Sequence, residues 1–102
     1  MKYNKLVRDR VPEVIEESGK KPIVHVVHGS ELVDKLKDKL KEEVDEFIVD
    51  EAIEELADIL EVVYALSFQK GVSIERLEQF RRLKAAERGC FEKGVILDEV
   101  CE

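Results

Sequence analysis

Two pairs of acidic residues in the middle of the chain have a spacing that could build a metal site. Glu43 and Glu46 are three positions apart, and so are Glu55 and Asp58. In an α-helix such residues are neighbours on one face, so each pair would present its two carboxylates together. Oxygen ligands favour magnesium or manganese over zinc. The two pairs therefore predict a Mg²⁺ site, which Mn²⁺ could also fill, if the chain folds back between them.

The charge around these pairs supports the same interpretation. Residues 42–61 contain ten acidic side chains and no Lys or Arg, whereas residues 1–22 contain six basic and four acidic ones, and residues 70–94 contain seven and four. Carboxylates at the edge of a core are costly unless they are paired or bind a metal. An acidic block between basic ends is typical of a site in which the acidic residues bind a cation and the basic residues bind an anion. The alternative for either pair alone is a solvated helix face, which charge-rich sequences often produce by chance.

The helices that must position these residues follow from the apolar spacing. It predicts a short helix at residues 12–17 and long helices at about residues 31–48, 51–70 and 74–88. Glu43 and Glu55 fall inside the apolar arcs of their helices. A turn near Asp50 would make the two acidic pairs face each other across an antiparallel hairpin. A straight helix over residues 31–70 is the alternative and would separate Glu43 from Glu55 by about 18 Å. The carboxylates favour the turn.

Together these elements predict one all-α domain over residues 1–102, an antiparallel bundle of three long helices plus a short N-terminal helix. Residues 23–27 and 94–100 are rich in Val and Ile and could pair as a small two-stranded ribbon. The predicted helix at 51–70 is apolar over about 220° of its circumference, whereas a surface helix shows a stripe of somewhat over 100°. We therefore expect self-association, as a homodimer or homotetramer, to complete the core.

The composition excludes several classes of function. A net charge of −7 argues against a protein that coats DNA or RNA, because phosphate binding needs a basic face. The chain has no run of 18 apolar residues and no leader pattern, so we expect neither a membrane span nor a signal peptide. Its two cysteines form no CxxC motif, so free thiols and a cytoplasmic location are expected. The charged fraction of 40% resembles that of proteins from hot environments.

Four stretches of the chain resemble a known superfamily. Residues 42–46 (EEVDE) and 55–58 (ELAD) are similar to the EExxE…ExxD motif of the all-α NTP pyrophosphohydrolases, which include MazG-like proteins, dimeric dUTPases and phosphoribosyl-ATP pyrophosphohydrolases. The opening YNKLVRDRVP at residues 3–12 and the later stretch at residues 84–91 resemble the ends of a short, phosphoribosyl-ATP pyrophosphohydrolase-like subgroup. The resemblance therefore covers nearly the whole chain.

The resemblance implies a role for each acidic residue of the motif. Glu43, Glu46, Glu55 and Asp58 would hold Mg²⁺ against the triphosphate oxygens of a nucleotide. The reaction would give a nucleoside monophosphate and pyrophosphate, in a house-cleaning role on non-standard nucleotides. Glu42 and Glu43 would be the catalytic carboxylates, with Glu42 either supporting the ligands or acting as the base for the attacking water.

The basic residues near the two ends suit a polyphosphate. We expect Lys5, Arg8, Lys84 and Arg88 to bind the substrate phosphates, and a solvated face with ordinary ion pairs is the alternative. Two other functions stay open. One is phosphoribosyl-ATP pyrophosphohydrolase proper, in histidine synthesis. The other is a non-catalytic helical dimer that binds nucleotides or a protein partner.

Overall fold

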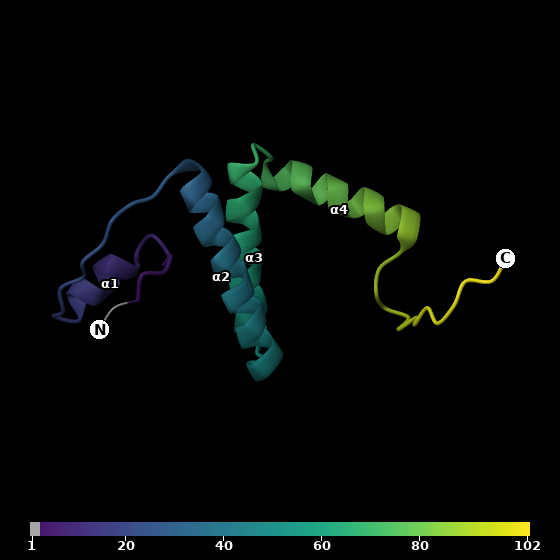
Figure 1. Cartoon of the computed structure of the whole chain (residues 1–102), viewed down its shortest axis with the longest axis horizontal. Coiled ribbons are helices and arrows are strands. Elements are labelled where there is room, and N and C mark those ends of the chain that lie inside the picture. The colour runs from purple at the N-terminus through teal and green to yellow at the C-terminus, as the bar shows by residue number, and fades with distance from the viewer. Residues whose placement is uncertain (1–2) are drawn as a thin grey trace.

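The computed structural model describes residues 3–102, which form a chain of helices (Figure 1). The prediction of an all-α protein is confirmed, since no strand occurs in this part of the chain. None of the helices it contains is long and apolar enough to cross a membrane. The helices are α1 (Val11–Glu17), α2 (Gly29–Asp50), α3 (Ile53–Gln69) and α4 (Ile74–Arg88).

The centre of the fold is a hairpin in which α2 and α3 pack side by side. The chain turns within two residues, Glu51 and Ala52, so the predicted turn is confirmed and the continuous helix is excluded. Glu51 adopts the left-handed conformation, with φ 55° and ψ 22°, and its N–H donates to the carbonyl oxygen of Phe47 at 2.8 Å. The buried apolar residues of the described chain are Leu36 and Val62, one from each helix.

The left-handed conformation of Glu51 yields a stability prediction. A side chain in this conformation costs about 1–2 kcal/mol, which glycine avoids, although glycine also loses more chain entropy on folding. Glu51→Gly is therefore expected to raise the free energy of unfolding by about 0.5–1 kcal/mol, measured by urea unfolding at one protein concentration. Asp45→Gly, an exposed position inside α2, is the matched control and should lower it by about 1 kcal/mol. A loss of stability in Glu51→Gly would contradict the prediction.

An elbow links α3 to α4. The hydroxyl of the buried Ser67 donates to the carbonyl oxygen of Val72 at 2.7 Å, and the N–H of Val72 donates back to the Ser67 carbonyl oxygen at 2.9 Å. Ser73 then caps α4 as predicted, its Oγ accepting from the Arg76 N–H at 3.1 Å. Because the elbow fixes the exit of the chain, α4 runs away from the end of the hairpin and contacts α3 but not α2.

The predicted two-stranded ribbon is wrong. Residues 23–27 and 94–100 form no strand, and they lie on opposite sides of the hairpin (Figure 1). Ile23 is 94% exposed and Val95 is 80% exposed. A preference of Val and Ile for strands has no effect where no neighbouring strand supplies hydrogen bonds and a packing surface.

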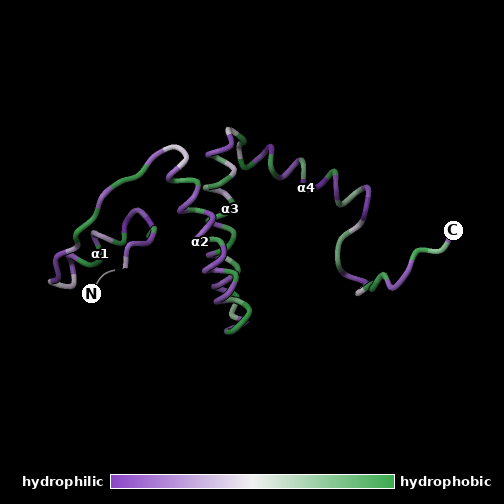
Figure 2. The backbone as a smooth tube through the Cα atoms, in the orientation of Figure 1, coloured by the Kyte–Doolittle hydropathy of each residue, from purple (hydrophilic) through white to green (hydrophobic). Residues whose placement is uncertain are grey.

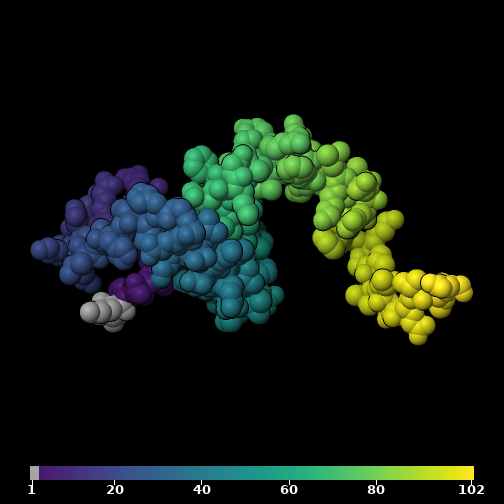
Figure 3. Space-filling view, turned by 45° about the horizontal axis from the view of Figure 1, so that its top comes forward, coloured from purple at the N-terminus to yellow at the C-terminus, as the bar shows by residue number. Residues whose placement is uncertain are grey.

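The single chain is elongated. Its radius of gyration is 18.0 Å and its principal extents are 63 × 32 × 22 Å, whereas a compact domain of this length has a radius of gyration of about 13 Å. The space-filling view shows α4 and the C-terminal segment arching away from the hairpin (Figure 3).

Candidate metal site and its basic neighbours

The hairpin brings carboxylates from both of its helices together. Glu43 of α2 and Glu55 and Asp58 of α3 each offer an oxygen atom within 4.8 Å of the others. Glu43 also belongs to a second group of the same size, with Glu42 and Glu46 of α2. The four residues predicted to hold a metal therefore lie in two overlapping groups that share Glu43. The arrangement arises because the turn at Glu51 sets the two acidic pairs against each other.

Glu43 is the most buried of these carboxylates, at 6% exposed. Its Oε1 atom lies 3.2 Å from the Nζ atom of Lys39, while its Oε2 atom is buried and has no hydrogen-bond partner. Burial is the main cause that raises the pKa of Glu43, and the neighbouring Glu46 raises it further, against the opposing effect of Lys39. Glu43 is therefore an acidic group that lacks full compensation for its charge.

Glu55 is in a similar state on the facing helix. Its Oε2 atom is buried and unpartnered. Burial is again the main cause that raises the pKa of Glu55, with Asp50, Asp58 and Glu43 adding to it and a hydrogen bond with Glu46 opposing it. Buried polar atoms nearly always have a partner. The two orphaned oxygens of this acidic group are of the donor type that Mg²⁺ or Mn²⁺ prefers.

The segment before α1 carries two basic residues onto this acidic group. The Nζ atom of Lys5 lies 2.9 Å from Oε1 of Glu42, and Nη2 of Arg8 lies 2.6 Å from Oδ1 of Asp58. The hydrogen bond from Lys5 lowers the pKa of Glu42, and the same contact raises the pKa of Lys5. Two of the predicted phosphate-binding residues therefore lie at the predicted site, Arg8 beside the predicted metal ligand Asp58 and Lys5 beside the predicted catalytic residue Glu42.

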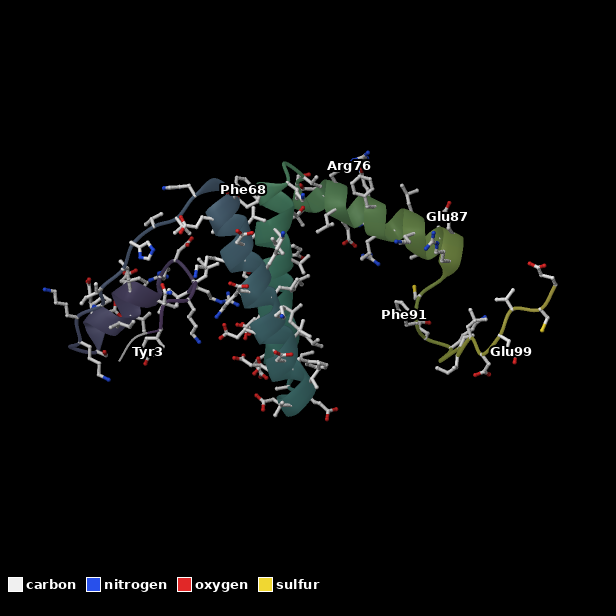
Figure 4. All side chains as sticks on the ribbon, viewed as in Figure 1. Tyr3, Phe68, Arg76, Glu87, Phe91 and Glu99 are labelled. Carbon is white, nitrogen blue, oxygen red and sulfur yellow. The ribbon has the colours of Figure 1, made fainter. Side chains whose placement is uncertain are left out.

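The other two predicted phosphate-binding residues are placed elsewhere. Lys84 and Arg88 belong to the outer half of α4. Figure 4 labels Glu87 on this half, at the end of the helix remote from the hairpin. Within a single chain, Lys5 and Arg8 therefore lie beside the carboxylates, whereas Lys84 and Arg88 of α4 lie apart from the carboxylates.

Sequence reasoning missed Lys39. Its Nζ atom lies 3.2 Å from Oε1 of Glu43 and 3.5 Å from Oε1 of Glu42, and its side chain is only 18% exposed. The signal was present, because Lys39 stands three and four positions before these residues and therefore on the same helix face. A cavity of about 40 Å³ adjoins it, lined by Asn4, Lys5, Leu6, Lys35, Asp38, Lys39 and Glu42.

Comparison of the chain with protein-family models, with curated proteins and with solved structures gave no match. The site's own geometry and the resemblance of its motifs are therefore the grounds for assigning a function.

Proposed function

We propose that this protein is a Mg²⁺-dependent nucleotide pyrophosphohydrolase that cleaves the bond between the α- and β-phosphates of a nucleoside triphosphate. The products would be a nucleoside monophosphate and pyrophosphate, and non-standard nucleotides are the proposed substrates. The main support is the group of Glu43, Glu55 and Asp58, each of which offers one oxygen within 4.8 Å of the others. Glu43 and Glu55 also each have a buried carboxylate oxygen without a hydrogen-bond partner. The resemblance of residues 42–46 and 55–58 to the EExxE…ExxD motif adds to it.

In this proposal Glu43, Glu46, Glu55 and Asp58 hold the metal. A bound Mg²⁺ would neutralise phosphate charge and make a bound water more acidic. Glu42 is a carboxylate that is ionised at neutral pH, and its contact with Lys5 lowers its pKa further. It can therefore accept the proton that the attacking water loses.

The N-terminal segment supplies the phosphate contacts. The guanidinium group of Arg8 can donate two parallel hydrogen bonds to a phosphate, a geometry that lysine cannot reproduce. It is 56% exposed at the edge of the carboxylate group and so is accessible to a nucleotide. Lys5 and Lys39 line the neighbouring cavity, which adds positive charge close to the carboxylates.

One observation favours a second candidate function. Arg8 contacts Asp58, Lys5 contacts Glu42 and Lys39 contacts Glu43, so part of the acidic charge is neutralised within the chain. A helical binding protein without catalysis would need no more than these ion pairs. This alternative predicts that divalent cations affect neither stability nor any activity.

A nucleotide panel separates the two candidates. We expect release of pyrophosphate from one or more nucleoside triphosphates, standard or modified, in the presence of Mg²⁺, with no release after chelation. Phosphoribosyl-ATP belongs in the panel, because preferential cleavage of that compound would assign the chain to histidine synthesis. If no substrate is cleaved and Mn²⁺ leaves the thermal midpoint unchanged, the non-catalytic candidate is correct.

A further inference from the structure

The small cavity beside the carboxylates has three lysines in its wall. Its polar lining consists of Asn4, Lys5, Lys35, Asp38, Lys39 and Glu42. Lys5 and Lys39 both contact Glu42 and offset its charge, and Asp38 is exposed to water. Lys35 is half-buried, and within residues 3–102 it forms no ion pair. Lys35 is therefore an unpaired cation in the wall of a cavity.

The cavity is too small for a nucleoside. Its volume is about 40 Å³, whereas sites for drug-sized molecules have volumes of about 300–1,000 Å³. One water molecule needs only about 10–15 Å³, so the cavity has room for a small group such as one phosphate. The lysine ammonium groups can bind a phosphate as point charges, and the side-chain amide of Asn4 can donate hydrogen bonds to it. The cavity therefore fits the phosphate end of a nucleotide but not its base or sugar.

The charges along the hairpin give the direction in which a polyphosphate extends. Residues 29–41 contain four lysines and three acidic residues, whereas residues 42–61 contain ten acidic residues and no basic one. Figure 2 shows hydrophilic residues recurring along α2. An anion on the turn side of the carboxylate group would meet only carboxylates, and repulsion between like charges opposes that placement. On the other side it meets Lys39 and then Lys35, which stands about 6 Å further along α2.

We propose that this cavity binds the terminal phosphate of a nucleoside triphosphate and that Lys35 donates to that phosphate. This rests on the proposed function, in which Glu43, Glu55 and Asp58 hold a metal ion against the phosphates nearer the nucleoside. Lys39 links the two places, because its Nζ atom lies 3.2 Å from Oε1 of Glu43 and its side chain also lines the cavity. A nucleoside diphosphate bound at the same metal is one phosphate too short to reach Lys35. The cavity therefore makes the enzyme selective for triphosphates.

The selectivity for triphosphates gives the first test. The kcat/KM is measured with Mg²⁺ for a nucleoside triphosphate and for the diphosphate of the same nucleoside, and the ratio of the two values is compared between variants. Lys35→Gln should lower this ratio by about 10-fold or more, the effect of one lost hydrogen bond between charged groups, and Lys35→Arg should restore most of it. Lys37→Gln is the matched control and should keep the ratio, because Lys37 is exposed on α2 outside the cavity. An unchanged ratio in Lys35→Gln, with nucleotides still cleaved, would overturn the phosphate site and leave the proposed function standing.

Binding of inorganic pyrophosphate tests the same site without turnover. Pyrophosphate contains the two phosphates that the reaction would release, and its dissociation constant can be measured by calorimetry with Mn²⁺ present. Lys35→Gln should raise this constant by about 10-fold or more, and Lys37→Gln should leave it unchanged. If this difference is found but no nucleotide is cleaved, the proposed function fails and the phosphate site stands. Equal binding by Lys35→Gln and the unsubstituted protein, or no binding by either, means that the cavity is not a phosphate site.

Discussion

Glu55→Gln is expected to lower Mg²⁺-dependent release of pyrophosphate by at least about 100-fold and, at the same time, to raise the thermal midpoint of the metal-free protein. The amide keeps the shape of the side chain but removes a negative charge and a metal ligand. Within residues 3–102 Glu55 has no cationic partner, and its Oε2 atom is buried. Removal of its charge relieves repulsion from Asp50, Asp58 and Glu43, the neighbours that raise its pKa.

Two other amide substitutions serve as controls for Glu55→Gln. Asp58→Asn should also abolish activity, but without a gain in stability, because Asp58 has an ion pair with Arg8 at 2.6 Å to lose. Glu54→Gln should change neither property, since Glu54 is exposed and stands outside both carboxylate groups. The measurements are pyrophosphate release and thermal unfolding with a chelator present. Full activity in Glu55→Gln would overturn the metal site.

The pH dependence of metal-free stability follows from the same carboxylates. The pKa values of Glu43 and Glu55 are raised above 4.5 in the folded protein. Their contribution to stability is therefore fully present below the unfolded value and is lost as pH rises through the folded values. The pKa of Glu42 is lowered, so its contribution is lost at more acidic pH. The thermal midpoint of the unsubstituted protein is thus expected to rise as the pH is lowered from neutral towards 5. The thermal midpoint of Glu55→Gln is expected to rise less over the same range.

Arg8→Gln is expected to raise the KM for the nucleotide by about 10-fold or more, with a smaller change in kcat. In the absence of nucleotide Arg8 lies 2.6 Å from Oδ1 of Asp58 and 4.0 Å from Oε1 of Glu61. When substrate binds, the same guanidinium group can donate to phosphate oxygens next to the metal. Removing it should leave Asp58 free, so Mn²⁺ affinity without nucleotide should be unchanged or a few-fold higher. An exposed ion pair of this kind is worth at most about 1 kcal/mol.

The matched control for Arg8→Gln is Arg10→Gln. Arg10 carries the same charge two positions later but pairs only locally, with Glu13 at 3.3 Å. The Arg10→Gln variant should have the same KM as the unsubstituted protein. Arg8→Lys should recover only part of the loss, because it restores the charge without the two parallel hydrogen bonds. Equal effects of Arg8→Gln and Arg10→Gln on KM would show that the segment contributes only general positive charge.

The sequence predicted those features that depend on residues close together in the chain. The α4 boundaries and the Ser73 cap are confirmed because helix periodicity and capping are local. Glu43 lay inside an apolar arc and is indeed 6% exposed. The turn at Glu51 could be inferred only from the carboxylates on either side of it, since the turn itself contains no Gly or Pro.

Features that depend on distant residues could not be predicted. The contact of Arg8 with Asp58 joins positions 50 residues apart, and no local pattern specifies it. Periodicity likewise gives the faces of α4 but not its direction, which the hydrogen bonds between Ser67 and Val72 determine. The ribbon prediction was wrong for the same reason, because a strand requires a partner whose position the local sequence does not fix.

The two-residue connection between α2 and α3 has a consequence for the order of folding. Contacts between neighbouring helices close short loops, and such contacts form in microseconds to milliseconds. The hairpin and its carboxylates should therefore assemble early. The contact of Arg8 with Asp58 closes a much longer loop and should follow.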